Sequence, residues 1–425
     1  MDANAAASEA HALALDAADP LSALRDEFLI PPHGSGEQAY FCGNSLGLQP
    51  RAVRAALERE LDGWALRAVE GHFEGAHPWL RMQDELAPTL AALVGAEPAE
   101  VVVMNALTVN LHLMMASFYR PTPERHAILI EQGAFPSDRH AVLGQLALHG
   151  HDPRSALIEV APDADGHFGT AAFAAALAEQ GHRIALVLLP GVQYLSGQLL
   201  DLRALSELAH RQGCCVGFDL AHAVGNVPLA LHDSHCDFAV WCSYKYLNGG
   251  PGAPAGCFVH ARHAHTPRPR LAGWWGHEAA TRFRMAPGFV PEAGAAGWQV
   301  SNPPILAMAP LHASLEPFRR VGMARLRERS LRLTGHLETL IRTRLDRVLE
   351  IRTPADPAQR GCQLSLRVRG GRGAGRALFE HLVAQGVIGD WREPDVIRLA
   401  PVPLYNRHMD NLRAVLAIEH WAARQ

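Results

Sequence analysis

The sequence predicts an α/β fold, in which a mostly parallel central sheet is covered by helices and a smaller α+β domain follows. Short apolar runs without period-2 alternation recur after residue 100 and alternate with helical segments, as in an open sheet buried on both faces. After about residue 300 the chain changes to long Arg-rich helix and short strands. We expect an N-terminal arm and loop over 1–60 that packs on the small domain, a large domain over 61–310 and the small domain over 311–425.

The N-terminal region is predicted to be an arm followed by a loop. Residues 1–20 are rich in alanine, and residues 28–50 are dense in Gly, Pro and Asn, which interrupt regular structure. The loop ends in the turn Gly43–Gly47, which is either a plain connection or a backbone segment that lies close to a substrate. Helical apolar spacing then predicts one helix over 51–70 and a second helix that ends near Val94.

The large domain is predicted from its alternating strands and helices. The first helix covers 108–119, with Thr108 as its N-cap. The predicted strands are residues 101–105, 127–132, 156–160, 184–190, 214–220 and 236–242. Because open parallel sheets bind ligands at the carboxyl ends of their strands, we expect the functional site at that edge.

The small domain is predicted to follow the chain break at 301–305, where two prolines stand together. It begins with a long helix and then contains two strands and two further helices. These elements are expected over 306–346 (helix), 362–369 (strand), 374–385 (helix), 396–400 (strand) and from 408 onward (helix).

Composition excludes several classes of protein. The net charge is −4, from 39 basic and 43 acidic residues, and no basic stripe suggests binding to nucleic acid. No apolar run is long enough to span a bilayer, and the first residues lack the pattern of a signal peptide. The seven cysteines form no CxxC pair, which is typical of buried thiols in a reducing compartment. We therefore expect a cytoplasmic protein that binds neither nucleic acid nor membrane.

Lys245 is the only lysine among the 39 basic residues, so all the others are arginine. In a chain this biased toward arginine, a retained lysine suggests a task that arginine cannot perform. A guanidinium does not lose its proton, whereas a primary amine can attack a carbonyl and form a Schiff base.

Asp219 stands at the end of the apolar run 214–218, and the next run, 236–242, leads to Lys245. A carboxylate at the end of a buried strand is costly unless a cationic group meets it. Two parallel strands ending in an aspartate and a unique lysine supply the pair that a pyridoxal phosphate site requires. The lysine holds the aldehyde carbon, and the aspartate keeps the ring nitrogen protonated.

Other polar and aromatic residues fall at the same predicted edge. Thr108 lies at a helix start, where free backbone N–H groups and a hydroxyl can bind phosphate. Phe135 could stack on a flat ring, and Asp138 lies close after it. His260, His263 and His265 resemble a ligand cluster, but the chain holds 24 histidines and we expect no metal.

Several motifs closely resemble the kynureninase family. They are FDLAHAVGNVPLALHDSHCDFAVWCSYKYLNGGPG around Lys245, NALTVNLH (105–112), FPSD (135–138), GWWGHE (273–278), SNPPI (301–305) and IRLAPVPLYN (397–406). The resemblance spans about residues 40–410. It implies a fold-type-I pyridoxal phosphate enzyme related to class V aminotransferases and cysteine desulfurases.

The resemblance implies roles for individual residues. Lys245, Tyr244 and Asp219 would be catalytic, with pyridoxal 5′-phosphate held as a Schiff base on Lys245. The cofactor-binding residues would be Leu107, Thr108, Phe135, Pro136, Ser137, Asp138, Asp219, His222, Tyr244, Lys245, Trp274 and Asn302. Substrate would be bound by Arg398, His72, Ser301 and Asn302, with Arg398 on its α-carboxylate.

The implied reaction is hydrolytic Cβ–Cγ cleavage of L-kynurenine to anthranilate and L-alanine, and of 3-hydroxykynurenine to 3-hydroxyanthranilate, in tryptophan catabolism or NAD biosynthesis. Trp274 and Asn302 would complete the site from the partner subunit, so a homodimer with shared active sites is expected. The preference between the two substrates stays open.

Two alternatives remain. A cysteine desulfurase or other class V relative would share Lys245, Asp219 and His222, but a desulfurase needs a reactive thiol on a mobile loop. Cys362 is the only cysteine in the last third of the chain and begins an alternating apolar segment. A non-catalytic, cofactor-bound protein on this fold is disfavoured, because the lysine, the aspartate, Tyr244 and the arginine clamp are all present.

Overall fold

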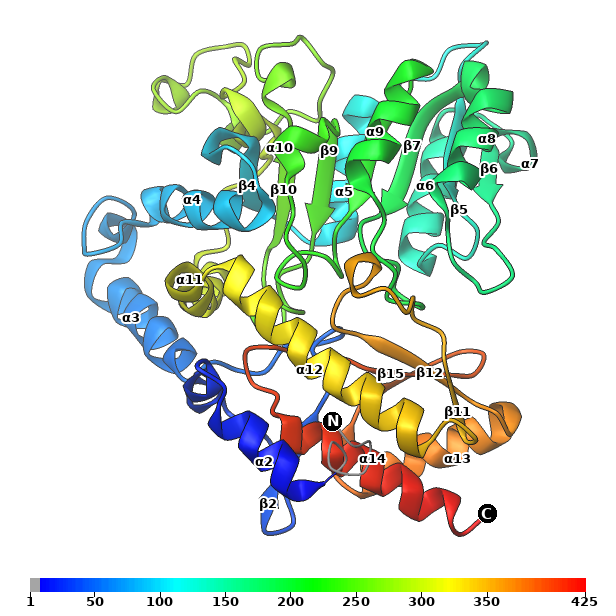
Figure 1. The fold of residues 1–425 in the computed structure, drawn as a ribbon. Helices are drawn as coiled ribbons and strands as arrows, with labels where there is room; N and C mark the ends of the chain where they lie inside the picture. The colour runs from blue at the N-terminus through cyan, green and yellow to red at the C-terminus, as the bar shows by residue number, and fades with distance from the viewer. Residues whose placement is uncertain (1–7) are drawn as a thin grey trace.

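The computed structural model describes residues 8–425 and contains a large sheet domain and a smaller one side by side (Figure 1). The first residues of the predicted arm, 1–7, lie outside the described residues. The arm continues as α2 (Glu9–Ala17), and the loop after it contains a small hairpin of β1 (Pro32–His33) and β2 (Gly36–Glu37).

The large domain is built on a seven-stranded sheet in the order β4-β10-β9-β8-β7-β5-β6. Five strands, from β9 to β6 in that order, pair in parallel, and β10 is antiparallel to both of its neighbours. The mostly parallel sheet is thus confirmed, although β10 was not predicted. The strands are β4 (Val101–Met104), β5 (Ala127–Glu131), β6 (Leu157–Val160), β7 (Ile184–Pro190), β8 (Cys215–Asp219), β9 (Phe238–Trp241) and β10 (Ala255–Val259).

Both faces of this sheet are buried. In β4, Val101 and Val103 enter one hydrophobic core, whereas Val102 and Met104 enter the other. This explains the unbroken apolar runs of the sequence. Helices α4 (Met82–Val94), α8 (Thr170–Gln180) and α9 (Leu202–Arg211) contribute to the first core, and α5 (Leu107–Phe118) and α6 (Pro136–Leu148) to the second. The short helices α7 (Pro153–Ala156) and α10 (Leu231–Ser234) join strands.

The small domain contains a four-stranded antiparallel sheet in the order β11-β12-β15-β14. The strands are β11 (Leu349–Ile351), β12 (Leu364–Val368), β14 (Asp390–Arg392) and β15 (Val396–Leu399), and the helices are α13 (Gly371–Ala384) and α14 (His408–Ala422). The N-terminal region joins it, because β3 (Ala39–Tyr40) pairs with β13 (Val387–Ile388) and α2 packs on α14.

The single helix predicted over 306–346 is wrong, because two helices occupy that stretch. They are α11 (Ile305–Val321) and α12 (Met323–Arg344), separated by Gly322. Gly322 adopts φ +81°, a conformation that residues with a Cβ rarely take, so the helix breaks there. Helix α11 packs on α3 (Ala52–Arg67) and α4, whereas α12 packs on α14, and the expected boundary at 310/311 falls within α11.

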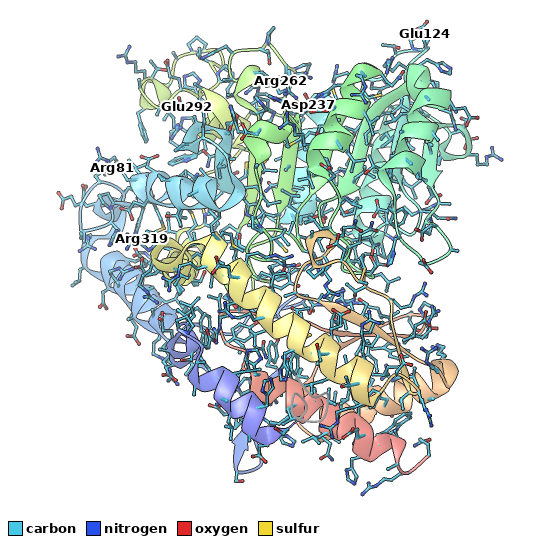
Figure 2. The ribbon with its side chains drawn as sticks, viewed as in Figure 1. Arg81, Glu124, Asp237, Arg262, Glu292 and Arg319 are labelled. Atoms are coloured by element: carbon cyan, nitrogen blue, oxygen red, sulfur yellow. The ribbon has the colours of Figure 1, made fainter. Side chains whose placement is uncertain are left out.

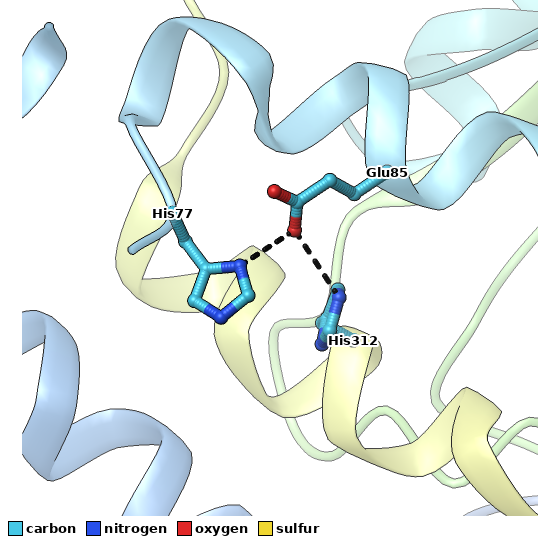
Figure 3. A group of neighbouring side chains, drawn as sticks. All are labelled: His77, Glu85 and His312. Carbon is cyan, nitrogen blue, oxygen red and sulfur yellow. Dashed lines mark hydrogen bonds and ion pairs between the residues drawn. The ribbon is translucent and has the colours of Figure 1, made fainter. Parts of the chain in front are cut away.

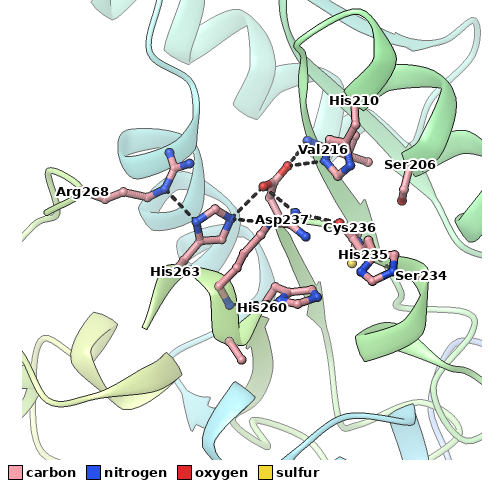
Figure 4. Close-up of polar contacts among 12 residues, drawn as sticks. Ser206, His210, Val216, Ser234, His235, Cys236, Asp237, His260, His263 and Arg268 are labelled. Carbon is pink, nitrogen blue, oxygen red and sulfur yellow. Dashed lines mark hydrogen bonds and ion pairs between the residues drawn. The ribbon is translucent and has the colours of Figure 1, made fainter. Parts of the chain in front are cut away.

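The carboxyl ends of β7 and β9 point toward the small domain (Figure 1). At the opposite end of the sheet, buried Asp237 ties β8 and β9 together (Figures 2 and 4). One of its carboxylate oxygens accepts hydrogen bonds from Val216 N at 2.7 Å and His210 Nε2 at 3.1 Å. The other lies 2.7 Å from both Arg262 Nη2 and His263 Nε2. This cluster fixes the two strands that carry Asp219 and Lys245.

Asp237→Asn is expected to lower the free energy of unfolding at pH 7 by about 1.5–3 kcal/mol, because the buried carboxylate accepts four hydrogen bonds that the amide cannot all accept. Although burial raises its pKa, hydrogen bonds from His210 and His263 and the charge of Arg262 hold the net pKa of Asp237 well below its ordinary value. The ionised group therefore stabilises the fold above about pH 3.9, and this contribution is lost as the pH falls further.

Urea unfolding at several pH values measures this effect. The matched control is Asp233→Asn, the same change at an exposed position four residues away. A loss of less than about 0.5 kcal/mol in Asp237→Asn, the scatter of ordinary surface substitutions, would contradict the anchoring role.

Candidate active site

The parallel pairing of β8 with β9 brings Asp219 and Lys245 to one edge of the sheet. Asp219 is the last residue of β8 and lies opposite Val240 of β9. Lys245 follows β9 in a tight turn, with its Nζ 5.9 Å from the ring centre of Phe135 and 6.0 Å from that of Tyr244. An amine, a buried carboxyl group and two aromatic rings therefore surround one space.

The turn Gly43–Gly47 lies directly against the lysine turn. Gly47 N donates a hydrogen bond to Tyr244 O at 2.8 Å. A Cβ at Gly47 would lie 2.3 Å from Lys245 O and 2.3 Å from Asn248 Oδ1, so only glycine fits at this contact. Residues 43–47 contact the lysine turn but are not among the residues that line the cavity, so their closeness to a substrate stays a prediction.

A narrow cavity lies above Lys245. Its lining includes the predicted residues Phe135, Asp138, Asp219, His222 and Lys245. It also includes residues to which the sequence assigned no role, namely Glu131, Pro190, Val192, Tyr194 and Ala221. A larger hollow of about 540 Å³ between α8 and α9 is lined by a different set of residues that lacks the lysine.

Asp219 and Asp138 form a buried carboxyl pair. Burial and the charge of Asp219 raise the pKa of Asp138 well above its ordinary value. Burial also raises the pKa of Asp219, but a hydrogen bond from Asp138 and the charge of Lys245 favour its ionised form. Asp138 therefore carries the shared proton, and Asp219 presents a carboxylate to any cation in the cavity. Asp219 Oδ1 is also held by Ala221 N at 2.7 Å.

Glu131 is a third buried carboxyl group, at the end of β5. Burial, together with the charges of Asp219 and Glu159, raises its pKa to about 8. Glu131 is therefore neutral in the folded protein over most of the physiological pH range. The rule that located Asp219, a carboxylate at the carboxyl end of a buried strand, applies equally to Glu131 and could have found it.

Glu131→Gln is expected to stabilise the apoprotein by up to a few kcal/mol at pH 8 and by little at pH 4. Because its pKa is higher in the folded state, wild-type stability falls as the pH rises from about 4.3, the unfolded pKa, toward 8. Thermal unfolding across this range measures the difference. The control is Glu124→Gln, the same change at an exposed position in the loop before β5. Parallel pH profiles for wild type and Glu131→Gln would disprove the assignment.

His222 and Tyr244 remain neutral at physiological pH. Burial and the charge of Lys245 hold the pKa of His222 well below its ordinary value. Burial and the neighbouring Cys242 raise the pKa of the Tyr244 phenol, so it stays a proton donor. Within the described residues, His222 Nδ1 and Asp138 Oδ1 are buried without a hydrogen-bond partner, which points to a ligand that supplies one.

The starts of α5 and α6 meet beside the cavity. Leu107 and Pro136 are their first residues, and Thr108 Oγ1 lies 2.7 Å from Ser137 Oγ. The prediction that Thr108 caps its helix is wrong: Ala106 holds the cap position without a capping side chain, and the Thr108 hydroxyl contacts Ser137 instead. Two helix N-termini and two hydroxyl groups form a site suited to a phosphate.

These features fit pyridoxal phosphate. Lys245 would supply the amine, Asp219 a carboxylate for a ring nitrogen, and the unpartnered His222 Nδ1 a group for the ring oxygen. Phe135 borders the cavity with its ring 37% exposed, which leaves a face for stacking.

Ten of the fifteen predicted site residues do not line this cavity within one chain, and they include Trp274, Ser301, Asn302 and His72. Trp274 is exposed and its Nε1 donates to Arg282 O at 3.1 Å. Ser301 and Asn302 are exposed, and His72 is half-buried with its ring 5.0 Å from that of Trp79. The resemblance placed Trp274 and Asn302 in the site of the partner subunit, and the assignment of all four residues stays a prediction.

Arg398 of β15 is fully buried, with its guanidinium already paired. Its Nε donates to Asp390 Oδ1 at 2.6 Å, its Nη2 pairs with the other oxygen of Asp390, and its Nη1 donates to Tyr194 O at 2.6 Å. Two of its five N–H groups, one on each terminal nitrogen, have no hydrogen-bond partner among the described residues.

Comparison with known proteins decides the family. Over 417 residues the chain is 66% identical to a kynureninase of Xanthomonas campestris pv. campestris (strain B100), covering 98% of each chain. It is 64% identical to a kynureninase of Xanthomonas axonopodis pv. citri (strain 306), covering 98% and 99% of the two chains. The chain belongs to the kynureninase family. A model of the kynureninase C-terminal domain also matches residues 326–418.

Solved structures show the same fold at low sequence identity. The apo cysteine desulfurase of Thermococcus onnurineus NA1 has a TM-score of 0.76 at 15% identity and covers 91% of this chain and 95% of its own. The cysteine desulfurase CsdA of Escherichia coli has a TM-score of 0.75 at 16% identity, with 94% and 98% covered. This kynureninase-family chain is therefore a fold-type-I enzyme, a hydrolase whose cofactor is pyridoxal phosphate.

The structure disfavours a desulfurase-like role for Cys362. Its side chain is fully buried, and burial raises the pKa of the thiol to about 12. A desulfurase thiol must ionise and reach the substrate.

From residue 8 onward, no helix is long and apolar enough to cross a membrane.

Proposed function

We propose that the enzyme hydrolyses the Cβ–Cγ bond of L-kynurenine to give anthranilate and L-alanine. The 3-hydroxy substrate would give 3-hydroxyanthranilate, and the reactions would serve tryptophan catabolism or NAD biosynthesis. The observation that carries the proposal is the full-length likeness to the curated kynureninases. The cavity around Lys245 supports it, because it combines the groups that such a cleavage needs.

The residues of the cavity suggest how the reaction would proceed. When bound, pyridoxal phosphate would supply an electron sink conjugated to the substrate α-carbon, which could accept the pair released at that carbon and then the pair left on Cβ. Lys245 Nζ would take the α-proton and hold it as an ammonium group for return. Asp219 would keep a cationic ring nitrogen protonated, with Asp138 donating a hydrogen bond to Asp219. Water adds to the γ-ketone, and collapse of the hydrate releases the aryl acid.

Tyr244 is assigned to proton transfer at the carbon left by this cleavage. Its raised pKa keeps the phenol protonated, and its ring centre lies 6.0 Å from Lys245 Nζ. A positioned acid of this kind contributes about 10²–10⁴-fold to the rate.

Arg398 is assigned to the substrate α-carboxylate. Asp390 and Tyr194 O fix the guanidinium plane, and the two remaining N–H groups match the two oxygens of a carboxylate. Trp274, Asn302, Ser301 and His72 would reach the site only in a homodimer, which we propose as the active form.

Steady-state assays with kynurenine and 3-hydroxykynurenine, following the fluorescent aryl amine, test the function. We expect stoichiometric alanine and turnover of both substrates, because His72 and Asn302 offer polar contacts for a ring hydroxyl. A protein loaded with pyridoxal phosphate that releases no aryl amine, or that releases sulfide from cysteine instead, would overturn the proposal.

Arg398→Leu is expected to raise KM for kynurenine by about 10-fold or more, since charged hydrogen bonds contribute about 1.5–3 kcal/mol. kcat should change less. The change is made in an Asp390→Asn background, so that no buried carboxylate loses its partner. Asp390→Asn alone is the control, and an unchanged KM in the double variant would remove Arg398 from the site.

A further inference from the structure

Three side chains outside the cavity converge on one point (Figure 3). His77 lies in the loop between η2 (Ala68–His72) and η3 (Trp79–Arg81), Glu85 in the first turn of α4, and His312 on α11. Glu85 Oε2 lies 2.9 Å from His77 Nδ1 and 3.4 Å from His312 Nε2. One potential ligand atom from each of the three side chains lies within 4.8 Å of the other two.

Within residues 8–425 the three ligand atoms have hydrogen-bond or ion-pair partners only among themselves, so a cation would replace contacts within the cluster alone. A second group, Glu100, His232 and His260, provides the contrast. Glu100 already accepts hydrogen bonds from Ala261 N at 2.7 Å and from Glu97 N at 2.9 Å. His260 Nδ1 accepts one from Arg262 N. In that group the Glu100 oxygens and His260 Nδ1 already accept hydrogen bonds from the backbone, so a cation would have to compete with these bonds.

The chemistry of the set suits a borderline divalent cation. Two imidazole nitrogens and one carboxylate oxygen are a common three-ligand zinc set, in which water takes the fourth position. The side chains are about one-third exposed, at 34%, 30% and 37%, which leaves room for an ion to enter and for that water. Binding needs each ring to move its N–H to the other nitrogen, so that a lone pair faces the ion.

Neighbouring charges are compatible with a cation. Glu316, one turn further on α11, adds negative charge beside His312. The nearby Arg59 is itself paired with Glu60 at 3.5 Å.

We propose that His77, Glu85 and His312 bind one Zn²⁺ ion per chain. Through these three side chains, the ion links the loop of residues 73–78 to α4 and α11. Phe73, Glu74, Gly75 and Ala76 are exposed, so this loop has few contacts of its own. His72 adjoins it, and the metal therefore orders the segment next to a residue assigned to the substrate.

Zn²⁺ titration of the metal-stripped holoenzyme tests the site. We expect one tight equivalent per chain in the wild type, and an affinity at least tenfold weaker in Glu85→Gln and in His77→Ala. His77 lies in a loop, so its variant folds even if a helix variant does not. The matched control is His126→Gln with His151→Gln, a half-buried pair with rings 4.7 Å apart.

Equal affinity in wild type and His77→Ala would overturn the proposal, as would equal loss in the control variant, which would show adventitious binding by surface histidines. Hydrogen exchange gives a second readout. Zn²⁺ should slow exchange of the amides of residues 73–77 in the wild type and leave it unchanged in His77→Ala. If Zn²⁺ does not slow amide exchange of residues 73–77 in the wild type, the proposed link between the loop and the two helices is wrong.

Discussion

Lys245→Arg abolishes both the yellow colour of the holoprotein and the release of aryl amine. A guanidinium stays protonated, so it neither forms the cofactor linkage nor takes up the α-proton. Loss of a positioned base alone costs about 10²–10⁴-fold. Because loss of cofactor attachment adds to this, we expect kcat to fall by at least about 10⁴-fold.

Absorbance spectra and single-turnover assays measure this loss. Lys245→Ala is the matched variant, because it leaves space in which an added small amine can act. We expect methylamine to restore part of the activity of Lys245→Ala and none of Lys245→Arg, where the side chain fills that space. An arginine variant that keeps its chromophore and its turnover would invalidate the assignment of the site.

Asp219→Asn should give the second largest loss, on the order of 10²–10³ in kcat, comparable to removing one preorganised electrostatic partner. The amide has nearly the same shape but no charge to hold a ring nitrogen protonated. Asp138→Asn is the informative comparison. Because Asp138 is the protonated member of the pair, its neutral replacement can still donate to Asp219.

We therefore expect Asp138→Asn to retain much more activity than Asp219→Asn, with KM nearly unchanged in both variants. Equal losses would show that the shared proton does not reside on Asp138. Both variants should be assayed at saturating pyridoxal phosphate, so that weaker cofactor binding does not lower the apparent kcat.

The sheet and its ligand edge could be predicted because each depends on local sequence. The run VVVM of β4 is apolar throughout because it faces two cores. Asp219 and Lys245 could be paired because parallel strands end at one edge. Strand β10 was missed since its short run AGCFV follows a Gly- and Pro-rich turn that reads as loop.

Other features depend on contacts between distant residues. The Thr108 hydroxyl contacts Ser137, 29 positions away, instead of capping its own helix. The pairing of Arg398 with Asp390 arises from two adjacent antiparallel strands whose register the sequence does not reveal. Gly322 stands alone in a helical pattern, where glycine is tolerated, so its positive φ could not be foreseen.

Because Lys245, in the turn against Gly47, is the single lysine of the chain, proteolysis can measure the fraction of chains that carry cofactor on it. After denaturation, a lysine-specific endoprotease has one bond to cut and yields fragments 1–245 and 246–425. Borohydride reduction fixes the cofactor on that side chain and should protect the bond. The ratio of uncut to cut chain on a gel then reports the fraction of molecules that carried cofactor.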